Sequence, residues 1–400
     1  MRVPSPTDPE IRSWQRTPLR IQNRYRYTRL LYSFFIVLPQ IPLVFLSSIL
    51  HLPYYGRRHW SFTYRAGILA ASYIIWSMNP GTQPRHDVVS LRARCAIPKL
   101  ASGQHAQLEV VPPAATQWIQ GDAQRSGMKT ESCPCFWQWT DATTSPLRDE
   151  RPVSERRIMM YFVGGGMVQG RPLSSPLPWR VMAKTGVPVF SVNFRKCVTS
   201  QTAFPGALQD AISAFSFLLE AGYRAQNISV MGDSGGAGIA ITLLLYLNKH
   251  QLPMPENAIL ISPFVDLVSK FDGQGEGGEE EARLIKLDFM NNEMLGMVGY
   301  QYCENRPELR ATLLSPSRGN LPEGYTYEGL CRSMLVWGDA EAFGPGVQKF
   351  AKHLRNAGVK VETVIGKDEV HDYPMFSRAD GSDEFFGRVG SFLEGDGLYE

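Results

Sequence analysis

Residues 228–240 read ISVMGDSGGAGIA, in which a serine flanked by glycines separates two apolar runs. The first run, Ile228–Met231, has the length of a buried strand, and the second continues to Asn248, at the length of a helix. Ser234 is therefore predicted to lie on a tight turn between a strand and a helix. The glycines two residues before and after it carry no side chain, which lets strand and helix approach closely.

The chain beyond residue 150 repeats this alternation of strand and helix. Strands are predicted at 157–163, 187–194, 228–231, 258–262, 334–337 and 359–365, and helices at 207–222, 236–248, 350–356 and 383–393. Such alternation predicts a mostly parallel central sheet with helices on both faces. Residues 84–112 are rich in β-forming residues and are expected to add antiparallel edge strands. A trypsin-like protease can also carry GDSGG, but it consists of strands throughout, so the alternation excludes that class.

Residues 266–330 lack the strand–helix rhythm and are expected to form a lid or loop insertion. They include GQGEGGEEE at 273–281, which is predicted to be an exposed loop or lid element. We divide the chain into an N-terminal membrane-associated or cap segment at 1–80 and a catalytic domain at 81–400.

The N-terminal segment contains LLYSFFIVLPQIPLVFLSSIL at 30–50, 21 residues without a charge, which is about the length that crosses a bilayer as a helix. Pro39 and Pro42 would kink such a helix or split it into a hairpin in one leaflet. We expect single-pass or monotopic attachment to a membrane, that of the endoplasmic reticulum. The alternative is a buried helix pair that caps the catalytic domain. The net charge of +3 gives no reason to expect a nucleic-acid partner.

A serine hydroxyl becomes a nucleophile only with a base, an acid that orients the base, and donors for the oxyanion. His371, in KDEVHDYPMF, is the histidine beyond Ser234 that is predicted to lie in a loop between strand and helix. His250 ends the nucleophile helix and His353 lies within a helix, so we interpret both as surface residues. His371 is therefore the candidate base.

The acid is expected after the strand at 334–337, where WGDAEAFGPG offers Asp339 and Glu341. The N–H of Gly235, at the helix start, is a candidate oxyanion donor. Glycines in YFVGGGMVQG permit a second turn that points N–H groups inward. This loop does not read as a dinucleotide site, because Gln169 stands where the third glycine belongs. Cys133-Pro-Cys135 lacks a second ligand pair, so we expect no metal.

Five ordered motifs across residues 150–395 resemble the hormone-sensitive-lipase group of α/β-hydrolases: GGG after a strand, FPGALQDA, GDSGG, WGDAEAF and VHDYPMF. The resemblance implies an α/β-hydrolase fold without a cofactor and Asp210 as a structural aspartate. It also implies the site residues, which are Ser234 as nucleophile, His371 as base, Glu341 as acid, and Gly165, Gly166 and Gly235 as oxyanion donors.

The chain departs from the family pattern at two places. Val163 stands where the family carries a histidine before the glycines, and Gly344-Pro345-Gly346 replaces the acidic residue that usually follows the acid loop. The family's histidine braces the oxyanion loop, so its loss alters the support of that loop. The apolar N-terminus makes the chain similar to fungal members, such as steryl acetyl hydrolases and hydrolases of secondary-metabolite gene clusters.

The leading interpretation is a membrane-anchored serine hydrolase that acts on a lipophilic carboxylic ester. The alternative keeps the fold but replaces hydrolysis by cyclisation or condensation of a polyketide-type intermediate, with His371 removing a carbon-bound proton. A non-catalytic receptor or scaffold is a third class, against which the intact Ser234 and His371 argue.

Overall fold

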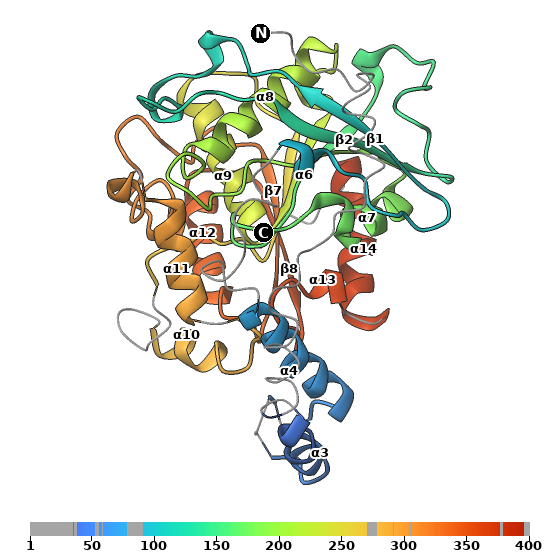
Figure 1. Ribbon diagram of the computed structural model, residues 1–400, viewed down its shortest axis with the longest axis vertical. Helices are drawn as coiled ribbons and strands as arrows, with labels where there is room; N and C mark the ends of the chain where they lie inside the picture. The colour runs from blue at the N-terminus through green and yellow to red at the C-terminus, as the bar shows by residue number, and fades with distance from the viewer. Residues whose placement is uncertain are drawn as a thin grey trace.

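The structure is a computed structural model that describes residues 35, 38–52, 56–57, 59–77, 91–269, 278–290, 292–304, 306–376 and 379–395. A twisted sheet runs through its centre, with the strand order β1-β2-β4-β3-β5-β6-β7-β8 (Figure 1). The strands are β1 (Gln104–Val111), β2 (Cys133–Thr140), β3 (Ile158–Phe162), β4 (Val189–Val192), β5 (Ile228–Asp233), β6 (Asn257–Ile261), β7 (Arg332–Gly338) and β8 (Val361–Gly366).

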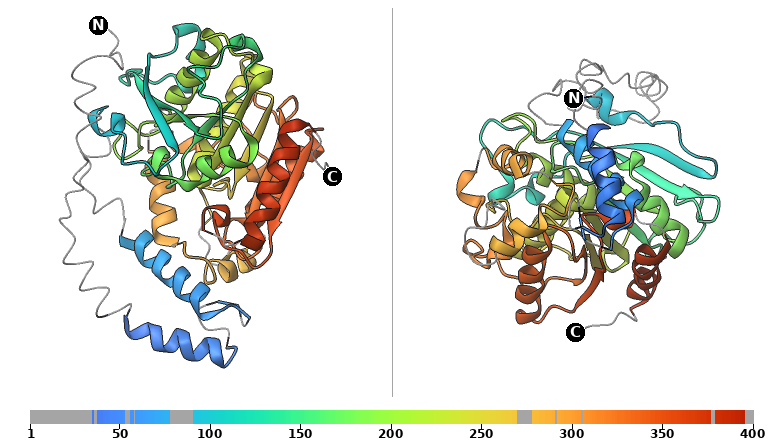
Figure 2. Two further views of the ribbon diagram at one scale, coloured as in Figure 1. Left: turned by 90° about the vertical axis from the view of Figure 1, so that its right-hand side faces the viewer. Right: turned by 90° about the horizontal axis from the view of Figure 1, so that it is seen from below.

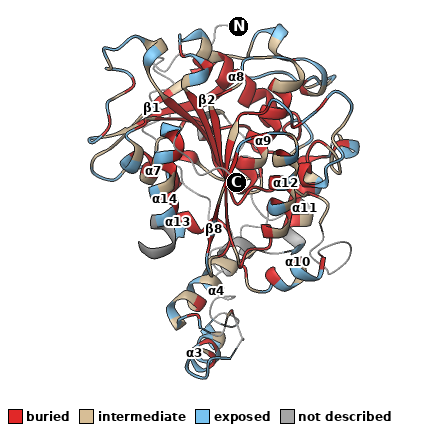
Figure 3. Ribbon diagram, turned by 180° about the vertical axis from the view of Figure 1, so that it is seen from behind, coloured by how far each residue is buried: buried red, intermediate tan, exposed pale blue. Residues whose placement is uncertain are grey.

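The predicted mostly parallel sheet is confirmed. Strands β3 to β8 pair in parallel, whereas β1 pairs with β2 and β2 with β4 in antiparallel register. The parallel strands are buried along most of their length, which explains why their sequences read as apolar runs (Figure 3).

Helices cover both faces of the sheet, as α/β layering requires. Figure 1 shows α7 and α14 on one side and α8, α9 and α12 on the other. The helices are α3 (Ile41–Ile49), α4 (Phe62–Ser77), α6 (Leu91–Cys95), α7 (Pro176–Thr185), α8 (Gly206–Glu220), α9 (Ser234–Lys249), α10 (Gly278–Leu284), α11 (Asn292–Tyr302), α12 (Gly344–Asn356), α13 (Tyr373–Phe376) and α14 (Ala379–Glu394).

The antiparallel edge was predicted only in part. Within residues 84–112, β1 begins at Gln104, residues 91–95 form the helix α6, and residues 84–90 lie outside the described residues. The strand that joins β1 to the parallel sheet is β2, which sequence analysis treated only as a cysteine pair. Its aromatic run, Phe136-Trp-Gln-Trp139, fits a pleated and half-buried surface and was the signal for a strand.

The predicted N-terminal membrane segment lies only partly within the described residues. Helix α3 covers nine residues, about 14 Å at 1.5 Å per residue, against a hydrocarbon core of about 30 Å. None of the helices in the described ranges is both long and apolar enough to cross a membrane. Pro42 occupies the first turn of α3 and Pro39 precedes it, so α3 begins where the two prolines were expected to kink or split a helix. Residues 30–34, 36 and 37 lie outside the described residues.

The segment at 266–330 contains two helices rather than loop alone. Residues 278–281 of the predicted loop or lid element begin the helix α10, and residues 273–277 lie outside the described residues. Three glutamates occupy the first turn of α10, where negative charge stabilises a helix. Helix α11 packs over the glycine loop: a Cβ added to Gly166 would lie 2.7 Å from Val298 of α11.

Candidate active site

Ser234 is the first residue of α9 and follows directly on β5. Its φ of +49° is a strained backbone conformation for a residue with a side chain, and such strain clusters at functional turns. A Cβ on Gly236 would lie 2.2 Å from a carbonyl oxygen of β3, and one on Gly232 would lie 2.7 Å from the Ala237 nitrogen. Both positions therefore require glycine, as the spacing around the serine predicted.

His371 lies in the loop after β8 and faces the serine. Its Nε2 is 2.9 Å from the Ser234 Oγ, a hydrogen-bond distance. Both residues are almost completely buried, with 4% of Ser234 and 2% of His371 exposed. The other two histidines lie elsewhere, because His250 packs on Tyr246 at the end of α9 and His353 contacts the backbone oxygen of Ser317 from α12.

Glu341 lies on the opposite side of the imidazole. Its Oε1 is 3.6 Å from the His371 Nδ1, longer than a hydrogen bond but within the distance of an ion pair. Its Oε2 accepts hydrogen bonds from the Ser262 hydroxyl at 2.6 Å and the Gly338 N–H at 2.9 Å. The carboxylate is fully buried and held toward the ring.

Asp339, the other acid candidate, points away from the imidazole. Arg57 donates hydrogen bonds to both its side chain and its backbone oxygen, at 3.2 and 2.9 Å, and also pairs with Asp368. Tyr64 donates to Glu369, the second residue before His371. The N-terminal segment thus contacts both the acid loop and the histidine loop.

The glycine loop after β3 lies against the first turn of α9. Gly165 and Gly166 have φ of +105° and +59°, values that glycine adopts without strain. A Cβ on Gly235 would lie 2.9 Å from the Gly166 Cα and 2.6 Å from the Met167 sulfur. The structure therefore brings all three candidate oxyanion donors together. Val163, where the family carries a histidine, is buried and only 5% exposed.

Asp233 fixes this loop, a role that sequence analysis missed although the residue lies inside GDSGG. Its carboxylate accepts the Gly164 N–H at 2.9 Å and the Tyr161 hydroxyl at 2.5 Å. Burial raises the pKa of Asp233 to about 6, and these two donors act against the rise.

Asp372 also escaped sequence analysis, although its place directly after the histidine was a usable signal. Its Oδ2 lies 3.3 Å from the His371 Nε2, the nitrogen that faces the serine. Burial opposes the charge on the ring, but Asp372, Glu341 and Asp288 outweigh it and raise the pKa of His371 to about 10.

Aromatic side chains form the walls around His371. Phe343 and Phe289 contact its ring edge-on, with centroids 4.7 and 5.8 Å away, and Phe264 stacks on Phe343 at 4.8 Å. Phe376 contacts Phe289 and is 62% exposed, so an apolar surface leads from the site to solvent.

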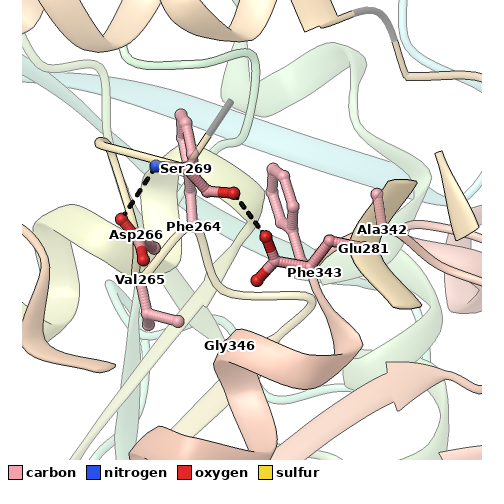
Figure 4. A pocket seen from close by; sticks show the side chains of 8 residues that line it. All are labelled: Phe264, Val265, Asp266, Ser269, Glu281, Ala342, Phe343 and Gly346. Carbon is pink, nitrogen blue, oxygen red and sulfur yellow. Dashed lines mark hydrogen bonds between the residues drawn. The ribbon is translucent and has the colours of Figure 1, made fainter. Parts of the chain in front are cut away.

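A cavity of about 10 Å³, enough for one water molecule, lies beside the Phe264–Phe343 pair (Figure 4). Ser269 on its wall donates one hydrogen bond to Glu281 and another, through its N–H, to Asp266. This volume is too small for an acyl chain.

Asp210 of α8 lies at the centre of a buried charge network, consistent with a structural role. It accepts hydrogen bonds from Arg195 at 2.8 Å and Arg94 at 3.1 Å. Within the described ranges, no three histidine, cysteine or acidic side chains converge as a metal ion would need. Cys133 and Cys135 are buried free thiols, as are the other four cysteines.

Comparison with known proteins places this chain in a family. Residues 159–375 match the family model described as the alpha/beta hydrolase fold. An acetyl-hydrolase of Streptomyces hygroscopicus is 30% identical over 53% of this chain and 65% of its own length. An ethyl acetate hydrolase of Pseudomonas putida is 26% identical over 58% of this chain and 72% of its own length.

Among solved structures, an esterase from the bacterial hormone-sensitive lipase family superposes with a TM-score of 0.58. It is 18% identical and covers 90% of this chain and 98% of its own, which shows a shared fold. The chain thus spans just under two thirds of the acetyl-hydrolase and nearly the whole of this structure.

Proposed function

The chain belongs to the α/β-hydrolase fold family, in the group of hormone-sensitive-lipase-like esterases, and from this premise we propose that it hydrolyses carboxylic esters with Ser234 as nucleophile. The observation that carries the proposal is the 2.9 Å contact between the Ser234 Oγ and the His371 Nε2, on a strained turn beside a glycine loop. Acyl transfer requires a hydroxyl that is held in position and that has a base within reach of its proton.

In the proposed reaction, the Ser234 hydroxyl gives its proton to the His371 Nε2 as its oxygen attacks the ester carbonyl carbon. The carbonyl electron pair moves onto the oxygen, which accepts hydrogen bonds from the N–H groups of Gly165, Gly166 and Gly235. The intermediate then expels the alcohol, which leaves with the proton from Nε2. Water repeats the sequence on the acyl-enzyme, releases the acid and restores the serine.

We assign the triad acid to Glu341. Its buried carboxylate faces the His371 Nδ1 and would shorten its 3.6 Å contact as positive charge develops on the ring. Asp339 is engaged by Arg57 instead, which supports a role in holding the loop.

We propose a lipophilic ester with a short acyl group as the substrate class. The aromatic walls formed by Phe289, Phe343 and Phe376 favour an apolar alcohol portion. The two relatives described above are named for acetyl and ethyl acetate hydrolysis, which favours a short acyl portion. Helix α11, which packs over the glycine loop, would act as a lid.

We further propose that the N-terminal segment attaches this enzyme to the membrane of the endoplasmic reticulum by entering one leaflet. Helices α3 and α4 project from the body of the molecule (Figure 2). The side chains of α3 that face outward are large and apolar, and those of Phe45, Leu46 and Ile49 are each more than half exposed. The opposite side of α3 is fixed to α4, because Arg65 donates to the Ser47 hydroxyl at 3.0 Å. A short apolar helix held in this way suits shallow insertion into one leaflet.

A cyclase or condensation enzyme remains the second candidate, and the observation that favours it is Val163, buried where the family carries a histidine that braces the oxyanion loop. In that reaction the His371 Nε2 would remove a carbon-bound proton, and the same N–H groups would stabilise the resulting enolate.

Purified protein assayed with p-nitrophenyl acetate, butyrate and palmitate separates the two functions. We expect cleavage of the short esters and complete loss in Ser234→Ala. A well-folded enzyme that labels with a fluorophosphonate at Ser234 yet cleaves none of these esters would exclude ordinary ester hydrolysis and leave the cyclase.

A further inference from the structure

A second carboxylate, that of Asp372, approaches the imidazole of His371 on its Nε2 side. In a serine hydrolase this nitrogen needs only the serine hydroxyl as its partner. The Oδ2 of Asp372 lies 3.3 Å from Nε2, the same nitrogen that is 2.9 Å from the Ser234 Oγ. The side chain of Asp372 is 10% exposed, and its Oδ1 is buried with no hydrogen-bond partner among the described residues. The carboxylate thus competes with Ser234 for one nitrogen.

The backbone holds Asp372 in this position. Its φ of +52° lies in the left-handed region, which aspartate and asparagine tolerate better than most residues. Its N–H donates to the Ser262 hydroxyl at 2.9 Å, and this hydroxyl in turn donates to Glu341. One serine hydroxyl therefore links the backbone of Asp372 to the carboxylate of Glu341.

We propose that Asp372 is a second acidic partner of the catalytic imidazole, which retains a proton between its carboxylate and the His371 Nε2 until alkaline pH removes it. The inference rests on the proposed function of Ser234 and His371. In the resting site, His371 and Asp372 together hold one more proton than they would if the imidazole were neutral and the carboxylate ionised. This proton must pass to water or hydroxide before Nε2 can accept the serine proton, and no other bond changes in that step.

The surroundings of the ring support retention of this proton. Four buried carboxyl groups face His371 from four elements: Asp372 from its own loop, Glu341 after β7, Asp233 at the end of β5, and Asp288 after α10. Asp288 is fixed by the N–H groups of Ala342 and Phe289, at 2.9 and 2.7 Å.

The raised pKa values of His371 and Asp372 refer to the same shared proton. Burial raises the pKa of Asp372 well above its usual range, and the carboxylates raise that of His371 to about 10. The proton cannot reside fully on both groups, and wherever it lies the Nε2 lone pair is occupied. We therefore expect kcat/KM to fall about tenfold for each pH unit below the pKa of the pair.

The variant Asp372→Asn tests the proposal, because asparagine keeps the shape and tolerates the left-handed backbone but removes the charge. We expect the acid limb of kcat/KM for p-nitrophenyl acetate to move to lower pH by about 1 to 3 units, the usual effect of one adjacent opposite charge. A second measurement needs no turnover: the C2 proton of His371, followed by NMR titration in Ser234→Ala with and without Asp372→Asn, should show the same shift.

Asp141→Asn is the matched control, because Asp141 contacts His105 at 2.6 Å on the surface, far from the reaction. It should leave the acid limb unmoved. If the esters are cleaved but Asp372→Asn moves neither the limb nor the titration, the proposal is wrong and the esterase function stands. If the titration moves in a protein that cleaves no ester, the proposal about the proton stands and the function needs revision.

Discussion

The acid loop allows two neighbouring carboxylates to be compared directly. Only Glu341 faces His371, so Glu341→Gln should lower kcat by about a thousandfold or more, whereas Asp339→Asn should cost far less. Both variants are to be assayed with p-nitrophenyl butyrate after circular dichroism has shown unchanged folding. The reverse ranking on folded proteins would assign the acid to Asp339.

Gly164 is a second residue at which the geometry gives a definite expectation. A Cβ there would lie 2.2 Å from the Asp233 carboxylate and 3.1 Å from the Ser234 Cβ, so Gly164→Ala must displace the loop or the serine. We expect fluorophosphonate labelling of Ser234 to be lost or severely slowed. Gly387→Ala is the control, since its Cβ meets nothing within 4 Å, and it should label normally. Normal labelling of Gly164→Ala would contradict this account of the loop.

The site residues that belong to sequence motifs were predicted. Those that carry no motif and approach the site only through the tertiary fold were missed. Ser234, Glu341 and His371 follow their strands in an order that can be read from the chain. Asp288 belongs to the region without strand–helix rhythm, and its approach to His371 depends on how that insertion folds back. Asp372 was adjacent to a recognised residue, but adjacency alone does not reveal which way a side chain points.

At the scale of one helix, α8 is anchored by the charge of Asp210. Replacing it by asparagine leaves Arg94 and Arg195 buried without a full counter-charge, because both side chains are almost inaccessible. We expect Asp210→Asn to lower the free energy of unfolding by about 3 to 5 kcal/mol, measured by urea denaturation.

The exposed pair of Glu280 and Arg283 gives the control for this measurement. Both side chains are at least half exposed, so Glu280→Gln should cost no more than about 0.5 kcal/mol. Equal effects of the two substitutions would show that burial of the Asp210 network contributes nothing to stability.

Helices and strands were predictable where the hydrophobic pattern of the sequence matches the burial of the element in the fold. The parallel strands are apolar because both faces are buried, and α8 and α9 carry apolar residues at helical spacing. Helix α7 was not predicted, although proline, here Pro176 and Pro178 near its start, is accepted in the first turn of a helix. The glutamates of α10 were assigned to a loop or lid element without a helix, because the benefit of their charge depends on where a helix begins.

Considered as a whole, the molecule presents most of its exposed large apolar side chains at one end: among the described residues, nine of thirteen lie at 35–52, on α3 and beside it. We predict that the full-length protein sediments with phosphatidylcholine vesicles and that removal of residues 1–56 weakens this. Leu46→Glu, at a position 51% exposed, should weaken it without the deletion. The matched substitution Leu147→Glu, at an exposed site on the body of the protein, should have no effect. A full-length protein that remains in the supernatant without detergent would refute membrane attachment.

Composition and pattern established the fold of the catalytic domain but not the conformation of its N-terminus. An uncharged run of 21 residues fits both a spanning helix and a shorter interfacial one, since length and hydropathy do not register where prolines interrupt the hydrogen bonds. The contact of Arg57 with Asp339 and Asp368 joins residues about 280 and 310 positions apart, and no local pattern encodes it.

The six thiols have a practical consequence for spectroscopy. All are unpaired and at most 8% exposed, so a thiol reagent in solution does not reach them, and burial raises the pKa of Cys95, Cys303 and Cys331 to about 12. The native protein is therefore already suited to site-directed labelling, without the removal of its own cysteines. A maleimide spin label or fluorophore attached to one introduced cysteine, for example at Leu46, would report immersion depth in a bilayer from a single position.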